Sequence, residues 1–155
     1  MTESLSPDTP FADRRRWMAV LARAGADRIA ALLDACENVP DHTILRGPER
    51  GLVMVRGRVG GGGSAFNLGE MTVTRCTVRT VTGFVGHAYI PGREERRAEL
   101  AALVDAMMQD RDRAAEVEVR VIQPLEQQQN VLRAERSAKA AATRVQFFAM
   151  LTMIT

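Results

Sequence analysis

Hydrophobic positions recur with a helical period at both ends of the chain and with a strand-like period in the middle. Before Pro40, apolar residues fall three and four positions apart, as at Trp17, Val20 and Leu21. From 42 to 91, runs rich in Val, Thr, Phe and Tyr alternate with glycine clusters, which is typical of antiparallel strands. After Gly92 the helical spacing returns. The pattern predicts an α+β protein with a central sheet between two helical flanks.

The N-terminal flank is expected to form a helical hairpin over residues 10–37, after a disordered stretch at 1–9. Thr9 and Pro10 suit the N-cap and the first helical position. Gly25 then ends the first helix, and a second helix follows with the same apolar spacing. Two short amphipathic helices joined by a single glycine form an αα-hairpin.

The central segment, 42–91, predicts an antiparallel sheet of about four strands. An edge strand starts at Thr43, and Gly47–Gly51 is expected to turn the chain into a second strand. Strand alternation places Val53, Val55 and Val59 on one face of that second strand. Leu52, Met54, Arg56 and Arg58 then share the opposite face.

The second half of the sheet begins at the glycine cluster Gly60–Gly63. Neither face of the long run 66–79 is cleanly apolar, so a bulge is expected near Thr74 and Arg75. The last strand is expected from Phe84 to Ile90. A phosphate-cradling role for Gly60–Gly63 is the alternative to a hairpin turn. The hairpin turn is favoured, because a P-loop leads into a helix and these glycines lead into a strand.

The C-terminal flank, 93–142, predicts three helices. The clearest runs from Arg93 to Gln109, a short one spans Arg111–Ile122, and a third begins after Pro124 with a weak apolar face. The final segment, 143–155, is apolar and is expected to be buried in this core or against another subunit. With 155 residues, the chain is expected to form a single domain over 1–155.

Positive charge is concentrated on the predicted sheet. Six arginines and two glutamates lie between Arg46 and Ile90, a balance of +4, whereas the whole chain carries +2. An anionic ligand or an acidic partner surface is one explanation, and solvated strand edges are the other. Arg75 lies among β-forming residues, so its guanidinium is expected to need a partner from another strand, a helix or another subunit.

Several classes of function find no support in the sequence. No apolar run approaches the ~20 residues of a membrane span, and no signal peptide is recognisable, so a cytoplasmic protein is expected. Cys36, Cys76, His42 and His87 are isolated, so no metal site is predicted. The sequence contains no nucleophile–base pair and no pair of carboxylates with acid–base spacing, so catalytic residues are not predicted. Aromatic residues make up 5% of the chain, which disfavours nucleic-acid binding.

The order of short motifs along the chain resembles the PhnG family, a small subunit of the bacterial carbon–phosphorus lyase system. The resemblance covers nearly the whole chain after Phe11. Its motifs are Arg16-Trp-Met-x-Val-Leu21, Arg58-x-Gly-Gly-x-Gly63, Gly69-Glu70, Thr74-Arg75, Val78-Arg79, Gly92-Arg93, Asp105-Ala-x-Met-Gln109, Pro124-Leu125 and Arg144-Val-x-Phe-Phe148.

The resemblance implies a role in organophosphonate catabolism within a core complex with PhnH, PhnI and PhnJ. With PhnH, PhnI and PhnL, the family supports replacement of the adenine of ATP by methylphosphonate, which gives α-D-ribose 1-methylphosphonate 5-triphosphate. ATP and methylphosphonate are substrates of the complex, and no cofactor or catalytic residue is expected in this subunit. Its expected role is structural or regulatory.

Binding or interface candidates are drawn from the sheet, its glycine turn and the C-terminal segment. They are Arg56, Arg58, Gly60, Gly61, Gly63, Arg75, Arg79, Arg93, Phe147 and Phe148. The alternative function is an autonomous anion- or nucleotide-binding module that uses the arginine-rich sheet.

Overall fold

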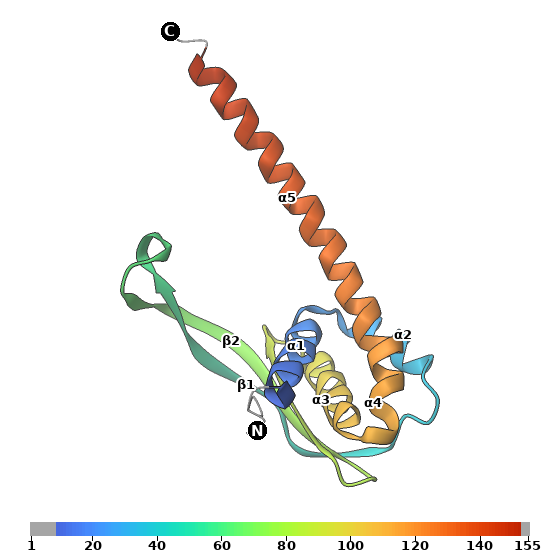
Figure 1. Cartoon of the computed structure of the whole chain (residues 1–155). Helices are drawn as coiled ribbons and strands as arrows, with labels where there is room; N and C mark the ends of the chain where they lie inside the picture. Colours follow the sequence, from blue (N-terminus) through green and yellow to red (C-terminus); the bar gives the residue numbers. More distant parts are fainter. Residues whose placement is uncertain (1–8, 153–155) are drawn as a thin grey trace, which may run out of the picture.

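The computed structural model describes the backbone of residues 9–152 and the side chains of residues 12–60 and 62–142. It confirms the α+β class, with two helices before the sheet and the remaining helices after it (Figure 1). The elements are α1 (Thr9–Arg23), α2 (Ala26–Asp34), β1 (His42–Arg58), the 3₁₀ turn η1 (Val59–Gly61), β2 (Ala65–Thr80), β3 (Val85–Pro91), α3 (Glu95–Gln109), α4 (Arg111–Val117), the π-helical turn η2 (Glu118–Ile122) and α5 (Gln123–Thr152).

The predicted helical hairpin is confirmed, with Gly25 between α1 and α2. Trp17, Val20 and Leu21 of α1 are buried, as their spacing predicts. On α2, Ile29 and Leu33 are buried. The hairpin therefore contributes one apolar stripe from each helix to the core.

The sheet has three strands in the order β1-β2-β3, so the expectation of about four was wrong. The predicted turn at Gly47–Gly51 lies inside β1, and residues on both sides of it pair with β2. The register shifts between Ile44 and Arg46 and again between Arg46 and Glu49, so the Gly-Pro sequence forms a bulge and does not reverse the chain. Gly47 has a φ of 75°, and a Cβ there would lie 2.5 Å from the Arg75 carbonyl oxygen.

The bulge predicted near Thr74 and Arg75 is also wrong, because the irregularity opposite those residues lies on β1. A further register shift makes Leu68 the extra residue of β2, since Val55 pairs with Gly69 and Arg56 pairs with Asn67. β2 therefore stays regular where all three strands meet, and there Thr74, Cys76 and Val78 share a buried face.

Helix α3 covers that face of the sheet, and α1, α2 and α4 pack around it. α3 is buried on more than one side, because small residues such as Ala98, Ala101 and Ala102 are enclosed along with the larger apolar ones. At Gly86 the helix meets β3 closely, since an added Cβ would lie 1.9 Å from the Ala102 carbonyl oxygen. Small residues on both elements therefore set the distance between α3 and the sheet.

The C-terminal helices follow one another almost without interruption. Pro124 was expected to start a separate helix, but it lies in the first turn of α5, directly after η2. The wider π-helical turn accommodates a residue that cannot donate an N–H within an α-helix. α5 also continues to Thr152, past the predicted end near Ala142. In the described part of the chain, no helix is long and apolar enough to cross a membrane.

Candidate functional site

Part of the β1–β2 hairpin extends beyond the sheet as a two-stranded ribbon, here called the arm (51–58 and 65–72). β3 pairs with β2 only from Val73 to Arg79, so no third strand covers the arm. Figure 1 shows the arm leaving the helical body and ending at the glycine turn. A two-stranded ribbon alone is only marginally stable in water. Its length therefore indicates a surface that gains contacts from another molecule.

The arm exposes large apolar side chains on both of its faces. Five of them have more than a third of their surface exposed: Leu52, Met54, Phe66, Leu68 and Met71. Leu52 and Met54 share the face predicted for them, and Val53 and Val55 are half-buried on the other. Val59 does not join that second face, because it lies in η1 and is 70% exposed. Exposed apolar residues clustered on one projection are typical of an interaction surface.

The glycines connect β1 to β2, as the hairpin-turn interpretation predicted. Gly60 has a φ of 61°. A Cβ on Gly63 would lie 2.7 Å from the Val59 carbonyl oxygen, so a side chain would disturb this turn. Arg58 donates from Nη1 to the Gly63 carbonyl oxygen at 3.2 Å. Arg56 has no ion pair among the described residues, so the tip of the arm carries positive charge.

Arg75 finds its partner on the neighbouring strand, as its position in the sheet required. Its Nε donates to Glu49 Oε1 at 2.6 Å, and Arg46 Nε donates to the same oxygen at 2.6 Å. Hydrogen bonding to Tyr89 and then to Glu49 raises the pKa of the Arg75 guanidinium. Desolvation would raise the pKa of the Glu49 carboxyl, but the two arginines outweigh it and the pKa falls below its ordinary value.

The remaining candidates do not gather around the arm. Arg79 is exposed at the far end of β2, and Arg93 is exposed just before α3. Phe147 and Phe148 belong to α5, but their side chains lie outside the described residues. Among the described candidates, those at the tip of the arm therefore lie apart from Arg79 and Arg93 and do not form one site with them.

Asp105 is a buried aspartate that was not among the predicted site residues. Its side chain is fully enclosed and joins α1, α3 and β3. Arg14 donates to both of its oxygens, from Nε at 3.1 Å and from Nη2 at 2.7 Å. Trp17 Nε1 donates at 2.9 Å, and the backbone N–H of His87 donates at 2.9 Å. The sequence could have indicated this role, because Asp105 lies among apolar residues of a helix, where a buried charge requires partners.

The isolated cysteines and histidines have local structural contacts. Burial raises the pKa of both the Cys36 and the Cys76 thiols, which lowers their reactivity. His42 Nε2 lies 2.8 Å from Glu99 Oε1, and His87 Nδ1 lies 3.1 Å from Thr77 Oγ1. In the described part of the chain, no group of three or more His, Cys, Asp or Glu side chains could hold a metal ion.

Helix α5 is the second projection of the molecule. Its first turns pack on α1 and η2, and the rest runs away from the body (Figure 1). Every residue from 131 to 142 is exposed, including Val131 and Leu132. These turns receive little support from the described body, so they form a second surface open to other chains.

A small α+β body with an uncovered arm and an uncovered helix has the build of a subunit in a larger assembly. Comparison with known proteins is consistent with this class. The family of the phosphonate metabolism protein PhnG matches residues 12–152. The alpha-D-ribose 1-methylphosphonate 5-triphosphate synthase subunit PhnG of Rhizobium meliloti (strain 1021) is 48% identical over 149 residues, 94% of this chain and 93% of the relative. The chain belongs to the PhnG family.

Proposed function

We propose that this chain is a subunit of an alpha-D-ribose 1-methylphosphonate 5-triphosphate synthase and acts in organophosphonate catabolism. The observation that carries the proposal is the 48% identity to such a subunit along nearly the full length of both chains. The two projections support it, because each leaves apolar residues uncovered. The partners proposed are PhnH, PhnI, PhnJ and PhnL, in a cytoplasmic complex.

The proposed reaction exchanges the base of ATP. The bond from ribose C1 to adenine breaks, a new bond forms from C1 to a phosphonate oxygen, and adenine leaves. In the proposal this chain positions other subunits and carries no catalytic group or cofactor of its own. Support comes from the Asp105 carboxylate, which is fully occupied by donors from this chain and has no room for an acid–base role.

An autonomous anion-binding module based on the sheet is the alternative. Three of the six sheet arginines, Arg46, Arg50 and Arg75, form ion pairs with glutamates of this chain. Their charge is therefore partly neutralised before any ligand arrives. That leaves the sheet less suited to independent anion binding than its composition indicated.

The test replaces the apolar residues of the arm and measures assembly. Leu52→Ser combined with Met54→Ser should weaken co-purification with PhnI and slow growth on methylphosphonate as the phosphorus source. The matched control is Val81→Ser with Val119→Ser, because both residues are exposed and lie off the arm. Wild-type chain that elutes alone in size exclusion, in the presence of the other subunits, would refute the proposal.

A further inference from the structure

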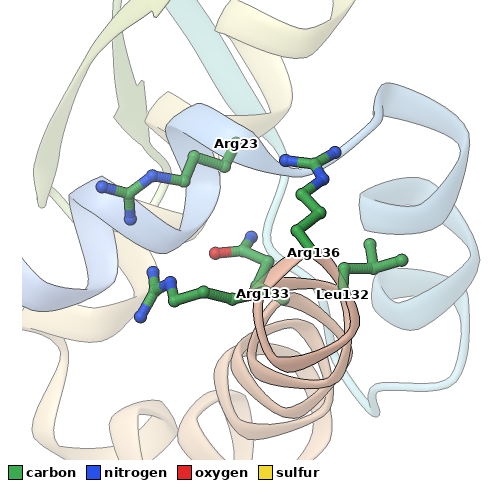
Figure 2. A pocket seen from close by; sticks show the side chains of 5 residues that line it. Arg23, Leu132, Arg133 and Arg136 are labelled. Carbon is green, nitrogen blue, oxygen red and sulfur yellow. The ribbon is translucent and has the colours of Figure 1, made fainter. Parts of the chain in front are cut away.

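A hollow of about 400 Å³ lies between α1 and α5. Its lining consists of Arg23 from α1 and Gln129, Leu132, Arg133 and Arg136 from α5. Figure 2 shows Arg133 and Arg136 extending from α5 on the side where α1 lies, with the Arg23 side chain running along α1. No carboxylate is among these lining residues. The size lies within the range of small-molecule sites.

The α5 side of this hollow is built on one helical face. Gln129, Leu132, Arg133 and Arg136 occupy positions i, i+3, i+4 and i+7, so their side chains share a face. Gln129 Nε2 donates to the Val20 carbonyl oxygen of α1 at 2.8 Å. That hydrogen bond ties α5 to α1 beside the hollow and fixes the separation of its two walls.

The arginines of the hollow have no carboxylate partner among the side chains that the structure describes, unlike the arginines that hold the elements of the body together. Eight other arginines pair with carboxylates of this chain: Arg14, Arg16, Arg46, Arg50, Arg75, Arg96, Arg113 and Arg120. Among the described residues, Arg23, Arg133 and Arg136 form no ion pair. In the described part of the chain, the one hydrogen bond from the Arg23 side chain goes to the Ala19 carbonyl oxygen of its own helix, at 3.3 Å. A guanidinium has five N–H donors, so most donors of this cluster stay available.

From this geometry we infer that the three-arginine hollow binds the phosphate groups of a phosphorylated small molecule. Guanidinium groups bind phosphate through paired, charge-assisted hydrogen bonds. Leu132 is 44% exposed beside them and offers an apolar surface for the rest of the ligand. The choice of a triphosphate rests on the proposed function, because the product of the related synthase is a 5-triphosphate.

Isothermal titration calorimetry of the full chain with inorganic triphosphate measures the dissociation constant and tests the inference. The variant Arg133→Gln with Arg136→Gln removes two charges from the hollow. The control, Arg28→Gln with Arg111→Gln, removes two charges from exposed arginines that do not line it and form no ion pair within the described chain. The hollow variant should raise the dissociation constant about tenfold or more, and the control should leave it nearly unchanged.

A second measurement follows the thermal melting of the same proteins. Triphosphate should raise the melting temperature of the wild type and of the control, but not that of the hollow variant. Equal binding by all three proteins, or equal loss in variant and control, would overturn the inference. Absent triphosphate binding by the wild type would overturn it too. Loss of PhnI co-purification in the hollow variant would then assign the hollow to a carboxylate of a partner. Normal triphosphate binding by a chain that fails to assemble would refute the proposed function and leave the site standing.

Discussion

Replacing Asp105 with Asn should destabilise the fold, although the two side chains have nearly the same shape. Asp105 Oδ1 accepts from Arg14 Nε and from Trp17 Nε1. Asp105 Oδ2 accepts from Arg14 Nη2 and from the His87 backbone N–H. An asparagine amide has only one oxygen, so either orientation turns an NH₂ group toward two donors. One enclosed donor, from Trp17 or from His87, then loses its acceptor.

The magnitude follows from how buried each partner is. An orphaned buried donor costs about 1–3 kcal/mol. Arg14 is 37% exposed and can turn toward water, so the lost ion pair adds only about 1 kcal/mol. The sum is about 3 kcal/mol, a large part of the ~5–15 kcal/mol that stabilises a typical domain. For a chain of this size the melting temperature should fall by about 6–12 °C.

Thermal unfolding followed by circular dichroism measures this change directly. Asp112→Asn serves as the control, because Asp112 is exposed on α4 and should change stability by less than about 0.5 kcal/mol. Arg14→Gln should have an intermediate effect, since water replaces part of what is lost. An Asp105→Asn protein that melts within about 2 °C of wild type would refute the reasoning.

Other substitutions test the sheet and its turn. Arg75→Met keeps the apolar stem and breaks the hydrogen bond to Glu49. The melting temperature and co-purification with PhnI should therefore fall before turnover of the assembled synthase does. Normal melting and assembly with lost activity would contradict this structural role. Gly61→Ser with Gly62→Ser should leave assembly and growth on methylphosphonate intact if the loop only closes the hairpin, and lost growth with normal assembly would make the loop a contact site. Gly86→Ala should cost about 3 kcal/mol in unfolding experiments because α3 has no space for a Cβ, whereas Gly69→Ala, with open space around it, should be nearly neutral.

The sequence predicted the parts of the fold that depend on local periodicity. Apolar spacing placed the helices, and the glycine cluster placed the hairpin turn, because both signals act over a few residues. The Gly47-Pro48 sequence was misleading, since the same residue types form turns and bulges and only the pairing with β2 decides between them. Spacing alone could not separate one long strand from two short ones.

The contacts of Asp105 and the three-arginine hollow were harder to find in the sequence. Arg14 and Asp105 are 91 positions apart, so their contact depends on how α1 docks on α3. The 129–136 face of α5 contributed little to an apolar pattern, and its arginines gain significance only beside Arg23. Interactions of this kind come from tertiary packing, which one sequence does not specify position by position.

The helical turns from α4 through η2 into α5 are continuous, so α5 can move as one rigid rod about its first turns. Thirty residues of α5, at 1.5 Å each, span about 45 Å, comparable to the width of a second protein domain. Its first turns are anchored to the described body, by Leu125 and the preceding Val121 and Ile122, which are buried in the core, and by the hydrogen bond from Gln129 to α1. A tilt of about 10° at these turns would carry the far end through about 8 Å. Small changes in how a few core side chains pack therefore become large displacements at the distance where another subunit would be held.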